Sequence, residues 1–230
     1  MSTITAIPVF YDDRMVADVV SFSPSAGKPK EVVNSWLGLG IPLSIAAPTP
    51  ITREQLYLAH TQNYVNNVLD CVTENGFGTI DPAVSESLRW TNGAVLSAAR
   101  SALHNRCVAV APASGFHHAS LCSGAGYCSF NGLMVAACTL LHECKVSRVG
   151  ILDLDMHYGN GTDDIIDKLG LSGHVTHFSA GLNWYQSRQA KTFLQMLPDL
   201  VEAFADCDLL IFQAGADCHK NDPLGVKWTP

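Results

Sequence analysis

The sequence predicts an α/β fold in three layers, with a mostly parallel sheet covered by helices on both faces. Short apolar runs alternate with segments of helical spacing, most clearly in the second half of the chain. Apolar strands that alternate with helices are typical of βαβ units, whose parallel strands are buried on both faces. Titratable side chains follow several of these strands, at the sheet edge where α/β proteins bind ligands. The 230 residues suffice for one sizeable domain, and no repeat or internal boundary divides residues 1–230.

The first half of the chain contains fewer strands. A short apolar strand is expected at residues 4–11, followed by a polar, proline-bearing loop at 21–30. Thr52-Arg-Glu-Gln55 matches a capping box, which predicts the start of a helix. The other expected elements are a helix, a glycine-rich loop and a second helix, at residues 63–72, 74–81 and 85–104.

The second half alternates between strands and helices. The expected strands are residues 108–111, 149–154, 175–179 and 209–212. The expected helices are residues 133–144, 163–169 and 190–204. Most of these strands lead directly into a polar or glycine-containing turn. We therefore expect the functional residues at the carboxyl ends of the strands.

Composition excludes some classes of protein. Hydrophobic residues make up 47% and charged residues 15% of the chain, as in an ordinary globular protein. The net charge of -7 argues against a nucleic-acid or membrane-surface binder. The eight cysteines form no C-x-x-C pair, which argues against a structural zinc knuckle and favours free thiols in a reducing compartment. With no secretory signal or membrane-spanning run, we expect a cytoplasmic protein.

Three titratable residues occupy alternate positions where strand 149–154 ends. In an extended segment, Asp153, Asp155 and His157 lie on one side, and Asp217 follows another strand. One imidazole and two carboxylates with an open position suit a catalytic Zn²⁺, with Fe²⁺ as the alternative. A lone D-x-D is more often a strand end or a helix cap. The register of His157 and the second acidic strand end favour a metal site.

Two adjacent histidines, His117 and His118, follow strand 108–111 in a loop next to Gly115. Such a pair on a surface loop is usually no more than polar sequence. Here it comes at the same sheet edge as the candidate metal ligands. An imidazole titrates near neutral pH and can act as general base or general acid beside a metal-bound water.

Four ordered segments resemble the histone deacetylase family of the arginase–deacetylase superfamily, and more closely its class II-like and bacterial members. The segments are SGFHHAS, GYCSFN, DLDMHYGNGT and AGADCHKNDPLG. The resemblance implies the arginase–deacetylase fold and a zinc-dependent hydrolase that cleaves the amide of acetyl-lysine or of a related acylated amine.

The resemblance also implies roles for individual residues. Asp155, His157 and Asp217 would bind zinc, and His118 would be the general base and later the acid. His117 would assist electrostatically, hydrogen-bonded to Asp153. Asn160 would orient His118 without adding charge.

Further residues would contact the substrate or a structural cation. Gly126 and Tyr127 match positions that line the acyl-lysine tunnel, and Asp81 is a candidate for the rim aspartate that grips the substrate backbone. A structural potassium ion would be held by Asp153, Asp155, His157, Ser179 and Ala180. The expected partner is an acylated lysine or amine, not a nucleic acid or a membrane, and a homo-oligomer remains open.

One departure from the family pattern concerns the tyrosine whose hydroxyl stabilises the oxyanion of the tetrahedral intermediate. The family places a tyrosine after a glycine-rich strand end, well downstream of the DPLG segment, whereas this chain ends eight residues after Asp222. The sequence therefore reads as a C-terminally shortened deacetylase. An alternative is a catalytically impaired module that binds metal or acyl-lysine. A binuclear manganese ureohydrolase shares the fold but needs D-x-H-x-D, and this chain has D-x-D-x-H.

Overall fold

The computed structural model describes residues 6–18, 24–219 and 221–222. The strands are β1 (Ile7–Phe10), β2 (Leu43–Ala46), β3 (Val149–Asp153), β4 (Val175–Ser179) and β5 (Leu209–Gln213). The α-helices are α1 (Lys28–Gly38), α2 (Arg53–Leu56), α3 (Gln62–Leu69), α4 (Pro82–Asn105), α5 (Gly132–His142), α6 (Asn160–Leu169) and α7 (Ala190–Glu202). The 3-10 helices are Asp13–Met15, Pro24–Gly27, Ala180–Leu182 and Ser187–Gln189.

All strand pairs among these residues are parallel, as the sequence predicts. One sheet has the order β4-β3-β5, and a smaller one pairs β1 with β2. In the larger sheet Asp153 lies level with Ser179 on one side and with Gln213 on the other. The carboxyl ends of three strands therefore meet at one edge.

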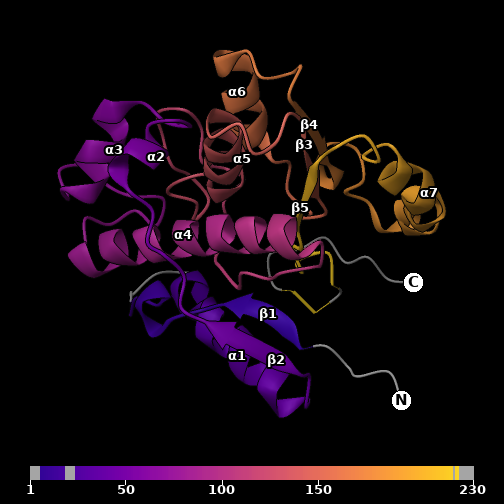
Figure 1. Cartoon of the computed structure of the whole chain (residues 1–230), viewed down its shortest axis with the longest axis horizontal. Helices are drawn as coiled ribbons and strands as arrows, with labels where there is room; N and C mark the ends of the chain where they lie inside the picture. Colours follow the sequence, from indigo (N-terminus) through magenta and orange to yellow (C-terminus); the bar gives the residue numbers. More distant parts are fainter. Residues whose placement is uncertain (1–5, 19–23, 220, 223–230) are drawn as a thin grey trace.

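The larger sheet is covered on both faces (Figure 1). Val149 and Ile151 of β3 belong to the main buried cluster, together with residues of α5 and α6. Side chains alternate along a strand, so Gly150 faces the opposite layer, where it lies against Phe204 just after α7. Phe193 of α7 stacks on Phe178 of β4 at 6.4 Å between ring centroids. The predicted three-layer α/β arrangement is thus confirmed around β3.

The sequence patterns did not predict two elements near the N-terminus, the helix α1 and the strand β2, which pairs with β1. Residues 21–30 were expected to be a loop, but α1 begins at Lys28 after a 3-10 turn, and residues 21–23 lie outside the described part. Pro29 at the start of α1 is favourable because its fixed φ suits the first helical turn. The strand expected at 4–11 is confirmed over Ile7–Phe10, and residues 4 and 5 are not described.

The prediction of a strand at residues 108–111 is wrong, because these residues form no continuous ladder of strand hydrogen bonds. Only one isolated bridge forms there, between Val110 and Val9 of β1, and Val108 is 75% exposed. An apolar run without neighbours on both sides cannot form a buried central strand. The segment instead runs beside β1 and leads into the loop that carries His117.

The other predicted helices and strands lie where the sequence places them, with shifts of a few residues. α2 begins with a complete capping box, in which Gln55 N donates to Thr52 Oγ1 at 3.3 Å and Thr52 N donates to Gln55 Oε1 at 3.0 Å. α4 is extended at its N-terminus to Pro82, with Asp81 as its N-cap.

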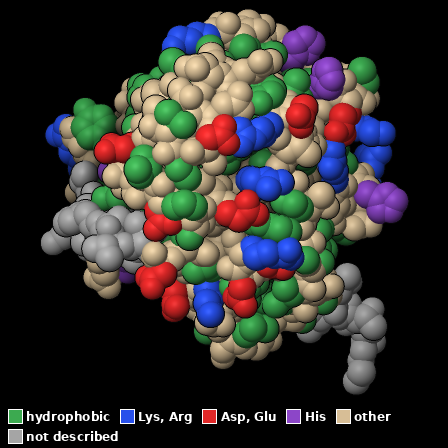
Figure 2. Space-filling model, turned by 90° about the vertical axis from the view of Figure 1, so that its left-hand side faces the viewer, with side chains coloured by type: hydrophobic (Ala, Val, Ile, Leu, Met, Phe, Trp, Pro, Cys, Tyr) green, Lys and Arg blue, Asp and Glu red, His purple; other side chains and the backbone are tan. Residues whose placement is uncertain are grey.

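Charges of both signs are interspersed on the face seen in Figure 2, where Asp and Glu lie among Lys and Arg side chains. A basic stripe that could follow a phosphate backbone is not seen on this face. None of the helices in the described part of the chain is long and apolar enough to cross a bilayer.

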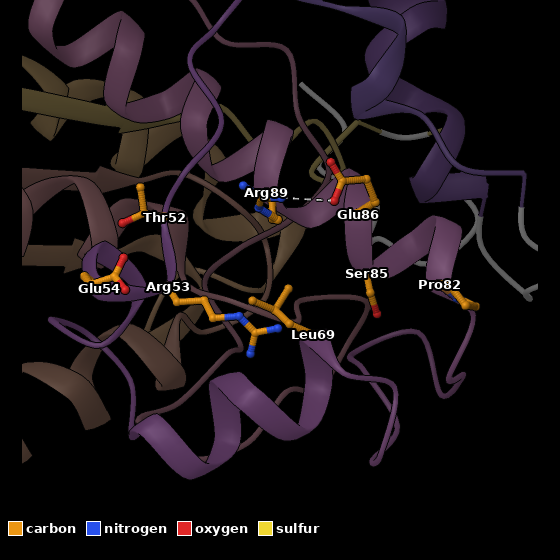
Figure 3. A pocket seen from close by; sticks show the side chains of 8 residues that line it. All are labelled: Thr52, Arg53, Glu54, Leu69, Pro82, Ser85, Glu86 and Arg89. Atoms are coloured by element: carbon orange, nitrogen blue, oxygen red, sulfur yellow. Dashed lines mark hydrogen bonds and ion pairs between the residues drawn. The ribbon is translucent and has the colours of Figure 1, made fainter.

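A polar pocket of about 390 Å³ lies between α2, α3 and the first turns of α4 (Figure 3). Arg53 and Arg89 both line it, but both have carboxylate partners: Arg53 pairs with Asp70 at 2.5 Å and Arg89 with Glu86 at 3.3 Å. Among the described residues that line it, the pocket therefore offers no unpaired cation to a ligand. None of its lining residues follows a strand of the larger sheet.

Candidate active site

The site begins where β3 ends. All five residues of β3 are buried, so the chain leaves the sheet directly after Asp153. Asp155 and His157 lie on the connection from β3 to α6, and Asp217 lies just after β5. Because β3 and β5 are neighbours, the two connections leave the sheet side by side and bring the three side chains together.

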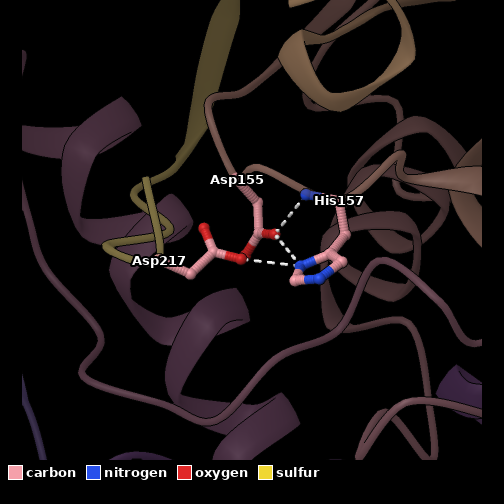
Figure 4. Close-up of side chains that lie close together, drawn as sticks. All are labelled: Asp155, His157 and Asp217. Carbon is pink, nitrogen blue, oxygen red and sulfur yellow. Dashed lines mark hydrogen bonds and ion pairs between the residues drawn. The ribbon is translucent and has the colours of Figure 1, made fainter. Parts of the chain in front are cut away.

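Asp155, His157 and Asp217 form a compact cluster (Figure 4). One ligand atom from each lies within 4.8 Å of the others. The Nδ1 atom of His157 is 2.6 Å from Asp217 Oδ2 and 3.3 Å from Asp155 Oδ1. Two carboxylates and one imidazole match the donor set of a catalytic zinc site with an open position. The imidazole of His157 is 47% exposed, so a ligand can reach it.

The two carboxyl groups influence each other strongly. Burial raises the pKa of Asp217 to about 6, and the negative charge of Asp155 adds to this effect. For Asp155, burial is outweighed by the charge of His117 and by the hydrogen bond from His157 N, so its pKa is lowered. Two acids this close without a cation between them repel each other, and a divalent ion would relieve that repulsion.

His117 and His118 have different partners. The Nδ1 atom of His117 donates to Asp153 Oδ2 at 2.7 Å, and Asp153 is fully buried. Burial alone would lower the pKa of His117, but the hydrogen bond and charge of Asp153 raise it overall. The two rings lie 4.1 Å apart between centroids. A raised pKa favours a positively charged His117, whose Nε2 lies 3.8 Å from Asp155 Oδ1.

The Nδ1 atom of His118 lies 2.7 Å from Asn160 Oδ1 at the start of α6. An amide oxygen only accepts, so Nδ1 carries the proton and Nε2 presents a lone pair. Burial lowers the pKa of His118, and the nearby His117 lowers it further against the opposing effect of Asn160. The ring of His118 lies 6.0 Å from that of His157.

A second loop closes over His118. Gly126 has φ +54°, and a Cβ at that position would lie 2.6 Å from His118 Cδ2. Tyr127 also has a positive φ, of 63°, and its N–H donates to Gly76 O at 3.0 Å. The ring of Phe77 lies 6.0 Å from that of Tyr127. Sequence reasoning missed Phe77, because only the fold brings the 74–81 loop beside Tyr127.

The other predicted site residues are divided between two places. Ser179 is level with Asp153 in the sheet, and its Oγ accepts a hydrogen bond from Gly159 N at 2.9 Å. Ala180 follows it and is buried. Asp81 instead caps α4, accepting from Ala83 N at 2.7 Å. The structure thus groups the candidate potassium ligands with Asp155, His157 and Asp217, and it gives Asp81 a local structural partner.

Comparisons with known proteins match the chain to one protein family. The model of the histone deacetylase domain matches residues 30–185, which is more than half of the chain. Histone deacetylase 2 of Arabidopsis thaliana is 26% identical over 212 residues, covering 80% of this chain and 54% of that protein. Acetylpolyamine amidohydrolase 2 of Pseudomonas aeruginosa is 33% identical over 139 residues, covering 47% of this chain and 39% of that protein.

The solved structures show the same fold. The crystal structure of the HDA15 HD domain superimposes with a TM-score of 0.78 at 20% identity, covering 96% of this chain and 75% of that chain. The chain thus spans about half the length of the Arabidopsis relative and three quarters of this solved domain. Because the family model matches more than half of the chain, the chain belongs to the histone deacetylase family.

Proposed function

We propose that this protein is a zinc-dependent deacylase that hydrolyses the amide of acetyl-lysine or of a related acylated amine. The observation that carries the proposal is the convergence of Asp155, His157 and Asp217 beside two histidines with different hydrogen-bond partners. Family membership supports amide hydrolysis as the reaction class.

The donor set fits a catalytic zinc ion. Asp155, His157 and Asp217 would hold it, with Fe²⁺ as the alternative occupant. When bound, the ion supplies a Lewis acid for the amide carbonyl and lowers the pKa of a coordinated water. Asp153, Asp155, His157, Ser179 and Ala180 are the proposed ligands of a structural potassium ion.

The two histidines would divide the proton chemistry. His118, with its lowered pKa and free Nε2, would take the proton from the attacking water and later give it to the leaving amine. Asn160 would hold the His118 ring in the required tautomer. His117, paired with Asp153, would remain in place as a positive charge near the oxyanion.

The loop over His118 would receive the acyl-amine. Gly126 and Tyr127 would line the path of the acylated side chain. Asp81 would contact the substrate backbone while it caps α4 through its hydrogen bond from Ala83 N.

The test is hydrolysis of a fluorogenic acetyl-lysine peptide and of an acetylated polyamine by the zinc-loaded 230-residue chain. We expect turnover that is lost on chelation and in His118→Ala. Stoichiometric zinc binding without turnover would instead support the alternative, a module that binds metal or acyl-lysine but does not catalyse. Failure to bind zinc would overturn the zinc-dependent deacylase.

A further inference from the structure

Within the described residues, the candidate metal ligand His157 lacks the support that such a ligand usually has. A histidine that binds a metal normally donates its second ring N–H to a carboxylate or carbonyl, which fixes the ring. Among the described residues, the polar contacts of the His157 ring are to Asp155 and Asp217, both through Nδ1. The direction of the ring must therefore be set mainly by the backbone on which it sits.

The next residue, Tyr158, anchors that backbone. Its hydroxyl donates to Asp163 Oδ2 at 2.5 Å, which ties the connection from β3 to the first turn of α6. Asp163 Oδ1 in turn accepts from His177 Nδ1 at 2.7 Å. His177 belongs to β4, so the chain of hydrogen bonds ends on the sheet itself.

His177 is buried beneath the same connection. Its side chain is 3% exposed, and its Nε2 has no hydrogen-bond partner among the described residues. A Cβ on Gly159 would lie 3.3 Å from this Nε2 and 2.7 Å from Asp153 Oδ2. Gly159 is also held by Ser179, so residues 158 and 159 are fixed from two sides.

We propose that Tyr158, Asp163 and His177 are positioning residues that fix the direction of His157 and so set the metal affinity of the site. The inference rests on the proposed metal site. It predicts that loss of the Tyr158–Asp163 hydrogen bond weakens metal binding although neither residue would touch the ion. Sequence alone does not suggest it, because Asp163 reads as an ordinary first-turn acid and His177 as a strand residue.

The first measurement is zinc affinity by competition with a chromophoric chelator. We expect Tyr158→Phe and Asp163→Ala to weaken zinc binding by about tenfold or more. Asp163→Asn keeps an oxygen acceptor and should recover part of the loss. Tyr11→Phe is the matched control, because it also removes a tyrosine–aspartate hydrogen bond, of 2.7 Å to Asp13, in the N-terminal part of the fold. Its zinc affinity should equal that of the unaltered protein.

A second measurement needs no metal and separates this inference from the proposed function. Amide hydrogen exchange of residues 157–159 in the zinc-free protein should be faster in Tyr158→Phe, and unchanged in Tyr11→Phe. Unaltered exchange together with unaltered zinc affinity in Tyr158→Phe would overturn the positioning role. Absence of zinc binding by the unaltered chain, with faster exchange in Tyr158→Phe, would overturn the proposed function and leave the restraint on the loop established.

Discussion

The absence of a side chain at Gly126 leaves room for the imidazole ring of His118, the proposed general base. The φ of +54° at Gly126 is one that side chains rarely adopt, and an added methyl group would lie 2.6 Å from His118 Cδ2. Gly126→Ala should therefore displace the His118 ring and lower kcat by about 10²-fold, since small misplacements of reacting groups are costly. The measurement is steady-state hydrolysis of an acetyl-lysine peptide.

Gly170 offers the matched control. It has a φ of +66° at the C-terminal cap of α6, but a Cβ there would meet no atom within 4 Å. Both substitutions impose similar backbone strain, of about 1 kcal/mol. Gly170→Ala should thus destabilise the fold comparably without affecting kcat. An equal loss of activity in both variants would show that strain, and not contact with His118, is responsible.

Asp81 connects a helix start with a proposed substrate contact, and the two roles can be separated. As the N-cap of α4 it accepts from Ala83 N at 2.7 Å. Asp81→Ala should lower the free energy of unfolding by about 1 kcal/mol, whereas Asp81→Asn should preserve it because asparagine caps as well as aspartate. Urea denaturation measures both.

The same pair of variants tests contact with substrate. A raised KM in Asp81→Asn at unchanged stability would support the charge of Asp81 as a substrate contact. An unchanged KM in Asp81→Asn would restrict the residue to capping α4.

His60 joins three elements and makes their packing sensitive to pH. Its Nδ1 donates to Ser120 O and its Nε2 accepts from Asn131 N, both at 2.9 Å, so the neutral ring links the end of α2 to the His118 loop and to the cap of α5. Burial lowers the pKa of His60 to about 4. Between the ordinary value of 6.5 and 4 the unfolded chain binds a proton that the folded chain does not.

Stability should therefore fall as pH decreases through this window. The expected contribution is a loss of ~3 kcal/mol between pH 7 and about pH 4, from a shift of roughly 2.5 in pKa. His60→Gln removes the titrating group and should flatten the dependence, and the exposed His142→Gln should not. Equal slopes of unfolding free energy against pH in His60→Gln and the unaltered protein would contradict this role.

The elements that sequence predicts well are those with a strong local signal. β3 and β4 are short apolar runs, and α6 begins at a glycine-rich turn, so the grouping of Asp155, His157 and Asp217 at one sheet edge follows from the order of strands. α1 was missed because it buries only Pro29 and Val33. The contact between Phe77 and Tyr127 depends on two loops distant in sequence, for which no local pattern exists.

At the scale of the whole molecule, the cluster of Asp155, His157 and Asp217 joins two connections that leave neighbouring strands. Asp155 and His157 follow β3, and Asp217 follows β5, so an ion bound by all three would couple them. A ligand that binds only the folded state at 100 times its Kd stabilises it by about 2.7 kcal/mol. For a protein of this size that corresponds to a rise in Tm of about 5–10 °C.

We therefore expect zinc to raise Tm in a calorimetric scan and a chelator to reverse the rise. Asp217→Asn should abolish most of it, because one carboxylate and one imidazole cannot complete the site. Asp199→Asn, an exposed aspartate of α7, should retain the full rise and controls for the loss of one negative charge. A rise that persists in Asp217→Asn would place the stabilising zinc elsewhere and separate it from the junction of β3 and β5.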